Sequence, residues 1–249
     1  MNITISPKYK YLQPFIESIP RIFGSTGDIV QDRRNTIKAI EVDGLKFNIK
    51  RYRRPIFFNR VVYTFFRATK AARAYKNAGI LTGKGIKTPL PIAYIEDFPG
   101  GLLDFSYFVS TQLYNVREVR EYCHSKVEGN EGLFRAFARY TAELHEKNIY
   151  HLDYSPGNIM ISDRDDGGYN FSLVDINRMK FIKVGIKAGC MNFARLFECD
   201  EVLEFMAVEY AGARNFDKAE CIKLILEYKY KAERRRMRKE KMKKILGVD

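Results

Sequence analysis

The chain has 249 residues, with 43 lysines and arginines against 30 aspartates and glutamates, which gives a formal charge of +13. Its apolar content of 46% excludes a disordered chain, and no apolar run is long enough to cross a bilayer as a helix. The start, MNITISPKYK, lacks an export leader, and four scattered cysteines without a CxxC pair argue against a disulfide framework or a structural zinc site. We therefore expect a globular protein of the reducing cytosol.

The first half of the chain has the pattern of a small sheet with one helix. Asp43–Gly44 is a hairpin turn signal, and the strand after it alternates apolar and polar residues from Leu45 onward. The expected order is strand, strand, helix, strand and strand, over residues 36–41, 45–51, 66–81, 92–97 and 102–113.

The second half is mainly helical. An amphipathic helix is expected at 131–147, two short strands at 158–162 and 171–176, and helices from Met191 onward. We therefore predict one α+β domain with a sheet-rich N-lobe, 1–112, and a larger helical C-lobe, 113–249.

The excess positive charge is concentrated near the C-terminus. From Lys229 to Lys244 there are ten basic and two acidic residues, so the rest of the chain carries only +5. This stretch is rich in helix formers, and we expect a basic helix end at about 229–244. A solvated helix end and attraction to anionic lipid headgroups both stay open. Nucleic acid is not expected as a partner, because the chain has no recognisable nucleic-acid-binding motif.

The most informative segment is His151–Asn158, which reads H-L-D-Y-S-P-G-N between an expected helix and an expected strand. Asp153 is predicted to accept the proton of an attacking hydroxyl, and Asn158 to offer a neutral oxygen to Mg²⁺. Asp175, at the end of the next strand, is predicted to be the second metal ligand. His151 is expected to hold the shape of the loop.

Each of these residues also has a structural explanation, because a lone Asp or Asn is often a cap or a turn residue. The ordered set is more specific. H-x-D-x-x-x-x-N, followed by a turn, an apolar strand and an Asp, is the arrangement of kinases with the eukaryotic-like fold. We therefore predict a bilobal protein-kinase-like fold with ATP between the lobes.

A kinase of this fold also needs groups that hold the nucleotide. Lys50 points away from the Phe47 and Ile49 face of its strand and is expected to hold the α- and β-phosphates, with an ordinary surface lysine as the alternative. The adenine is expected near the join of the lobes, at Gln112, Leu113 and Tyr114.

The loop that covers the phosphates has two alternative positions. No G-x-G-x-x-G pattern occurs in this region, but Gly24 and Gly27 form a short glycine pair. The other candidate is the turn between the first two strands, with Arg33, Arg34 and Asn35.

The chain resembles the bacterial lipopolysaccharide kinases, the Kdo and heptose kinase family. The matching stretches include F-N-I-K-R-Y-R-R-P, H-L-D-Y-S-P-G-N-I-M and L-V-D-I-N-R, within about Leu45 to Arg178. The resemblance implies ATP-dependent phosphorylation of a Kdo or heptose hydroxyl on the lipopolysaccharide inner core or lipid A precursor, with ATP and Mg²⁺. It also implies a cytoplasmic protein of a Gram-negative bacterium, with a lipid A/Kdo glycolipid as acceptor and peripheral contact with the anionic inner membrane. The oligomeric state stays open.

The chain departs from the family pattern at one position. Many relatives carry a glutamate in the small-lobe helix that pairs with the strand lysine, in a run similar to S-K-A-R-R-E-Y, whereas this chain has Ala74 there. This departure leaves a nucleotide-binding pseudokinase scaffold open as an alternative. A small-molecule kinase and a RIO-like Ser/Thr protein kinase stay open as further alternatives.

Overall fold

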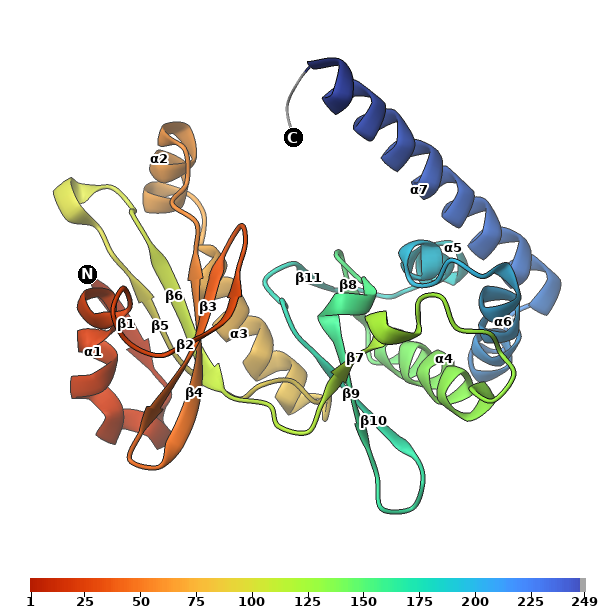
Figure 1. Ribbon diagram of the computed structural model, residues 1–249, viewed down its shortest axis with the longest axis horizontal. Helices are drawn as coiled ribbons and strands as arrows, with labels where there is room; N and C mark the ends of the chain where they lie inside the picture. The colour runs from red at the N-terminus through yellow and green to blue at the C-terminus, as the bar shows by residue number, and fades with distance from the viewer. Residues whose placement is uncertain (247–249) are drawn as a thin grey trace. The chain divides into compact units, whose positions relative to one another are not determined.

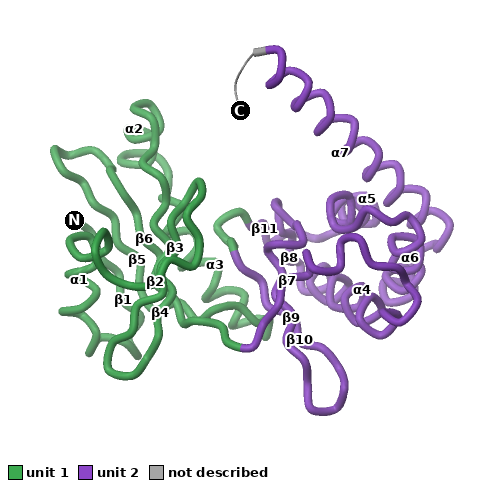
Figure 2. The backbone as a smooth tube through the Cα atoms, in the orientation of Figure 1, with its two compact units in different colours: residues 1–114, 175–178 green, residues 115–174, 179–249 purple. Residues whose placement is uncertain are grey.

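The structure, a computed structural model, describes residues 1–246 and divides into two compact units (Figure 2). Unit 1 comprises residues 1–114 and 175–178, and unit 2 comprises residues 115–174 and the chain from residue 179 onward. The main division therefore falls after Tyr114, and a four-residue segment around Asp175 belongs to the first unit.

Unit 1 is built on an antiparallel sheet in the order β1-β5-β6-β4-β3-β2 (Figure 1). Its strands are β1 (Asn2–Ile5), β2 (Asp28–Asp32), β3 (Thr36–Val42), β4 (Leu45–Tyr52), β5 (Pro91–Glu96) and β6 (Ser106–Thr111). Its α-helices are α1 (Gln13–Ile22), α2 (Phe57–Phe65) and α3 (Lys70–Gly83), and 3-10 turns lie at Pro7–Leu12 and Pro99–Gly101.

Unit 2 combines helices with short strand pairs, in which β9 pairs with β10 and β7, and β8 with β11. Its strands are β7 (Arg117–Glu118), β8 (Ile149–His151), β9 (Ile159–Asp163), β10 (Tyr169–Leu173) and β11 (Met179–Phe181). Its α-helices are α4 (Glu131–Glu146), α5 (Ile186–Asn192), α6 (Asp200–Arg214) and α7 (Lys218–Leu246), and 3-10 turns lie at Val119–Tyr122, Pro156–Asn158 and Phe193–Arg195.

The two faces of the sheet in unit 1 pack against different helices, because side chains alternate along each strand. Phe47 and Ile49 of β4 are buried in the core that α1 closes. On the other face, the ring of Tyr94 in β5 lies 5.4 Å from that of Tyr75 in α3, and Figure 1 shows α1 and α3 on opposite sides of the sheet. Lys50, which follows Ile49, projects on the α3 face.

The predicted hairpin is confirmed, because β3 and β4 pair Val42 with Leu45. Asp43 and Gly44 between them have φ values of 52° and 74°, as a tight two-residue hairpin turn requires. The helix expected at 66–81 begins later, since Thr69 caps it by accepting a hydrogen bond from the Ala72 amide at 3.1 Å. The expected element order is also incomplete, because it omits the additional elements β1, α1, β2 and α2.

The predicted amphipathic helix at 131–147 is confirmed as α4, which packs against α6. The last helix, α7, is anchored only along its first half, where Ile225 and Lys229 are buried. All side chains from Arg234 to Ile245 are exposed. Within residues 1–246, no helix is both long enough and apolar enough to span a bilayer.

Candidate active site

Lys50 and Asp175 form an ion pair in unit 1. Lys50 Nζ lies 2.7 Å from Asp175 Oδ1, and the lysine side chain is only 11% exposed. Opposite charges attract more strongly there than in water, because the effective dielectric is lower. Ala74 is buried in α3 and brings no charge, so Asp175 is an acid that balances Lys50 in place of a helix glutamate.

Asp175 is held in an uncommon backbone conformation by its neighbours. Its φ of 52° lies in the left-handed region, which Asp tolerates better than most other side chains. Asn177 Nδ2 donates to Asp175 Oδ1 at 2.6 Å, and Asn77 of α3 donates from Nδ2 to the carbonyl oxygen of Ile176 at 2.7 Å. The helix α3 therefore fixes the segment that carries this carboxylate, and such strained residues concentrate at functional sites.

Lys70, the first residue of α3, adds a second amine beside this pair. Lys50 Nζ and Lys70 Nζ lie 5.5 Å and 6.0 Å from the centre of the Tyr52 ring. The pKa of Lys70 is lowered, first because burial desolvates the amine and next because Arg34 and Arg73 are close. An anionic ligand would relieve this repulsion. The motifs do not mark Lys70, although the Thr69 cap is a signal that places it at a helix start.

The turn at residues 33–35 joins β2 to β3. This is the place in the sheet that the second of the two predictions for the phosphate loop gave it. The amide of Arg33 donates to the carbonyl oxygen of Asn35 at 3.3 Å, and Arg34 is close enough to lower the pKa of Lys70. Gly24 and Gly27 lie before β2. Gly27 has a φ of 85°, and a Cβ there would lie 2.5 Å from the Ile40 side chain, so this glycine permits close packing on β3.

Gln112, at the end of the β6 segment, is already held by side-chain hydrogen bonds. Asn48 Nδ2 donates to Gln112 Oε1, and Gln112 Nε2 donates to the carbonyl oxygen of Leu113, both at 3.0 Å. Tyr114 is exposed. The side chain of Gln112 therefore fixes the backbone at the end of β6, which is the segment where the adenine is expected to bind.

In unit 2, His151 shapes the loop that carries Asp153. The amide of Asp153 donates to His151 Nδ1 at 3.0 Å, so Nε2 bears the ring proton and donates to the carbonyl oxygen of Val174 at 3.4 Å. Asn158 Nδ2 donates to the carbonyl oxygen of Asp153 at 2.9 Å, which directs the amide oxygen of Asn158 away from that bond. Both hydrogen bonds fix the loop at Asp153.

Arg195 is a charged neighbour of Asp153. A guanidinium nitrogen of Arg195 lies 2.9 Å from Asp153 Oδ1, and both side chains are partly exposed. Because Arg195 follows Asp153 by many residues and belongs to no recognised motif, the sequence offered no signal for this pair. Its effect in unit 2 is to orient the carboxylate.

A buried chain of hydrogen bonds supports the same loop from behind. Asn192 Nδ2 donates to the carbonyl oxygen of His151 at 3.2 Å, and Asn192 Oδ1 lies 3.0 Å from His145 Nε2. His145 Nδ1 lies 2.8 Å from the Tyr210 hydroxyl. Burial lowers the pKa of His145 to about 4, so the ring is neutral at pH 7, with its proton on Nε2.

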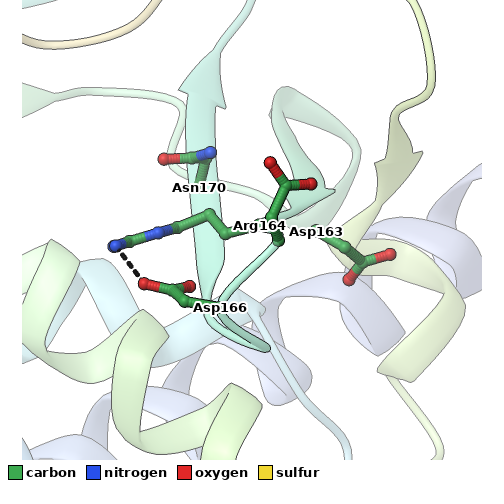
Figure 3. A pocket seen from close by; sticks show the side chains of 5 residues that line it. Asp163, Arg164, Asp166 and Asn170 are labelled. Carbon is green, nitrogen blue, oxygen red and sulfur yellow. Dashed lines mark hydrogen bonds and ion pairs between the residues drawn. The ribbon is translucent and has the colours of Figure 1, made fainter.

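A hollow of about 370 Å³ lies elsewhere in unit 2, at the tip of the β9–β10 hairpin (Figure 3). Asp166 faces Arg164 in an ion pair, and Arg117 lies 2.5 Å from Asp163. The amide of Gly168 donates to Asp166 Oδ1 at 3.0 Å. These contacts stabilise the turn of the hairpin and give its acidic side chains a structural role. Among the described residues, none that was expected in the active site lines the hollow.

A family model for the lipopolysaccharide kinase (Kdo/WaaP) family matches residues 25–228. The chain belongs to this family. The match includes Lys50, Asp153, Asn158 and Asp175.

Two relatives of this lipopolysaccharide kinase family member are informative. A 3-deoxy-D-manno-octulosonic acid kinase from Vibrio parahaemolyticus serotype O3:K6 (strain RIMD 2210633) is 26% identical over 137 residues, which span 53% of this chain and 57% of the relative. A solved structure described as WaaP in complex with acyl carrier protein aligns over 94% of this chain and 99% of that chain, with a TM-score of 0.64 and 15% identity. The second match shows a shared fold, consistent with the bilobal kinase-like architecture.

Each unit of this family member carries an oxygen donor of the hard kind that Mg²⁺ prefers. Asp175 offers a carboxylate and Asn158 an amide oxygen. The amide of Val174 donates to the carbonyl oxygen of Asn158 at 2.9 Å, and Val174 directly precedes Asp175 in the chain. This hydrogen bond ties Asn158 to the strand end at Val174 within unit 2.

Proposed function

We propose that this chain is an ATP-dependent kinase that phosphorylates a sugar hydroxyl, on Kdo or heptose, of the lipopolysaccharide inner core or lipid A precursor. The observation that carries the proposal is the Lys50–Asp175 pair at 2.7 Å, in a chain of the lipopolysaccharide kinase family. In kinases, the lysine at this position of the motif binds the phosphates of the nucleotide, and the aspartate binds the metal ion.

In this proposal the two units act as one kinase-like domain, and each residue has a separate task. Lys50 binds the α- and β-phosphates of ATP, helped by Lys70 and the turn that contains Arg34. Asp175 and Asn158 would hold Mg²⁺, which neutralises charge on the phosphate oxygens when it is bound. Because Lys50 and Asp175 are paired with each other beforehand, nucleotide binding exchanges one ion pair for two new charge contacts.

The chemical step is an in-line phosphoryl transfer. The acceptor hydroxyl oxygen forms a bond to the γ-phosphorus while the bond from that phosphorus to the β,γ-bridging oxygen breaks and ADP leaves. Asp153 accepts the hydroxyl proton, and Arg195 orients the carboxylate for this task. Gln112, Leu113 and Tyr114 contact the adenine. Catalysis depends mainly on alignment and electrostatic stabilisation.

The proposed acceptor explains the charge of the chain. Kdo carries a carboxylate and lipid A carries phosphates, so a formal charge of +13 favours their approach. We propose a cytoplasmic location, with peripheral contact to the anionic inner membrane of a Gram-negative cell.

The test is an ATP-consumption assay of the full chain with Kdo-lipid A, an aminoglycoside and a generic protein as alternative acceptors. Phosphate transfer to Kdo-lipid A alone supports the proposal, and transfer to either other acceptor contradicts it. Mass spectrometry of lipid A-core from cells with and without the gene then locates the added phosphate.

The role of Asp153 is tested by Asp153→Asn, which keeps the size of the side chain but removes the base. Turnover should fall by about 10²- to 10⁴-fold, while ATP affinity, measured by thermal shift with Mg²⁺, stays close to that of the natural chain. Asp163→Asn, at the exposed hairpin, is the control. Undiminished turnover in Asp153→Asn contradicts the assignment, and ATP binding without turnover in the natural chain favours the scaffold.

A further inference from the structure

The helix α2 is held to the rest of unit 1 by hydrogen bonds from its polar side. Arg60 Nε donates to the carbonyl oxygen of Leu103 at 2.7 Å, and the amide of Leu103 donates to Thr64 Oγ1 at 3.0 Å. Arg60 also donates to the carbonyl oxygen of Leu102 at 3.4 Å. The side of the helix that faces the rest of unit 1 therefore makes hydrogen bonds through Arg60 and Thr64, whereas an amphipathic helix usually turns its apolar side inward.

The apolar side of α2 faces solvent. Phe58, Val62 and Phe65 follow the i, i+4, i+7 spacing of one helix face, and the two phenylalanines are 79% and 66% exposed. None of the residues Phe57–Phe65, all within the described chain, is buried. We call this surface the α2 aromatic face, and it consists of Phe58, Val62 and Phe65. Ile56, Phe57 and Phe66 at the ends of the helix are exposed as well.

Exposed arginines lie at both ends of the helix α2. Residues 51–73 contain seven arginines and lysines and no acidic residue. Arg53 and Arg67 at the two ends of α2 are exposed, and Arg54 pairs with Asp104 of unit 1. A partner for this surface must therefore accept aromatic side chains and carry negative charge at the same time.

We propose that the α2 aromatic face inserts into the interfacial region of an anionic phospholipid bilayer, with the arginines at the ends of the helix on the headgroup phosphates. Phenylalanines on one helix face and cations beside them are the composition of interfacial helices. A second copy of the chain would set the exposed Arg53 and Arg67 against the same arginines, and residues 51–73 hold no acidic residue to balance them, which disfavours self-association. Figure 1 shows α2 projecting from the sheet of unit 1, and the side chains of Phe58 and Phe65 on this helix are exposed.

The proposal specifies where the membrane contact suggested above lies, and its test needs neither nucleotide nor acceptor. The full chain is sedimented with vesicles of phosphatidylglycerol and phosphatidylethanolamine, and with vesicles of phosphatidylcholine. Phe58→Ser/Phe65→Ser should weaken binding to the anionic vesicles by about tenfold or more, because both rings leave the interface. Tyr11→Ser/Leu90→Ser, which removes exposed apolar side chains from other parts of unit 1, is the matched control and should bind as the natural chain does.

Each outcome decides the proposal. Loss of binding in Phe58→Ser/Phe65→Ser alone, with an unchanged melting temperature, supports it. Equal binding of both double variants overturns it and points to charge alone, for which the exposed end of α7 is the candidate. Absence of binding by the natural chain also overturns it, and an acidic protein then becomes the fitting partner. Because no phosphoryl transfer is measured, a failure here leaves the kinase assay to be judged by itself.

Discussion

The functional residues of the two units are held in different ways. In unit 1, Lys50 and Asp175 are fixed by opposite charges on partly accessible side chains. In unit 2, the loop around His151 is fixed by neutral buried groups, Asn192, His145 and Tyr210. A charged pair can exchange its partners for a phosphate and a metal, whereas a neutral buried network keeps its geometry when ligands bind.

The largest effect expected from this contrast is on catalysis. Lys50→Met removes the charge that the proposal assigns to the phosphates, and turnover should fall by about 10²- to 10³-fold, by analogy with the loss of one preorganised electrostatic contact. Lys46→Met, on the same strand with the exposed partner Asp28 at 3.3 Å, is the control. Retained turnover in Lys50→Met would show that another cation binds the phosphates.

The second effect is the dependence of stability on pH. An unfolded histidine titrates near 6.5, whereas the pKa of buried His145 is lowered to about 4. Between these values the unfolded chain binds a proton that the folded chain does not, so the free energy of unfolding falls as the pH decreases, by roughly 3 kcal/mol in total.

His145→Gln removes this titration. Urea unfolding between pH 7 and pH 4 should therefore show a shallower loss of stability for the variant than for the natural chain. Equal slopes would mean that the neutral His145 is not the group that makes the network sensitive to acid.

The third effect tests how closely the network is packed. A Cβ at Gly189 would lie 2.0 Å from the Tyr210 hydroxyl, so Gly189→Ala should destabilise unit 2 by about 1–3 kcal/mol. Gly212 of α6 has no neighbour within 4 Å of such a Cβ, and Gly212→Ala is expected to stabilise slightly. Similar melting temperatures for the two variants would contradict the close packing on Tyr210.

The smallest effect is expected at Lys70. If it assists Lys50 with the phosphates, Lys70→Ala should weaken ATP binding by about three- to tenfold, since a partly exposed charge contact is worth little more. Lys76→Ala removes an exposed amine from the same helix and serves as the control. Calorimetric titration with ATP and Mg²⁺ measures both, and equal affinities would leave Lys70 without this role.

Local signals in the sequence were sufficient for parts of the fold. The Asp43–Gly44 turn and the alternation in β4 predicted the hairpin, and helical spacing predicted α4. The helix α2 was missed although Phe58, Val62 and Phe65 recur at helical spacing in the sequence, and the spacing alone does not show that this apolar side faces solvent. The short strand β1 pairs with β5, which follows much later in the chain, and only the folded sheet shows this pairing. The strand β2 pairs with the next strand, β3, but it is short and exposed, so no buried face marks it in the sequence.

The candidate site was predictable where its residues share a motif. The order of His151, Asp153, Asn158 and Asp175 in the sequence indicated a kinase-like loop. The roles assigned to these four residues stay predictions. The contact between Lys50 and Asp175 was not predictable, because tertiary packing rather than sequence distance brings the two together. Arg195 and Asn192 were missed for the same reason.

The exposed end of α7 has a practical consequence for handling the protein. Lys229 is buried against Asp200, but every side chain from Arg234 to Ile245 is accessible, and many of them are arginine or lysine. Trypsin cleaves after these residues, so brief digestion should cut within residues 234–245 before it cuts the packed part of unit 2. A trimmed preparation of this kind would carry less charge and should be easier to purify and crystallise.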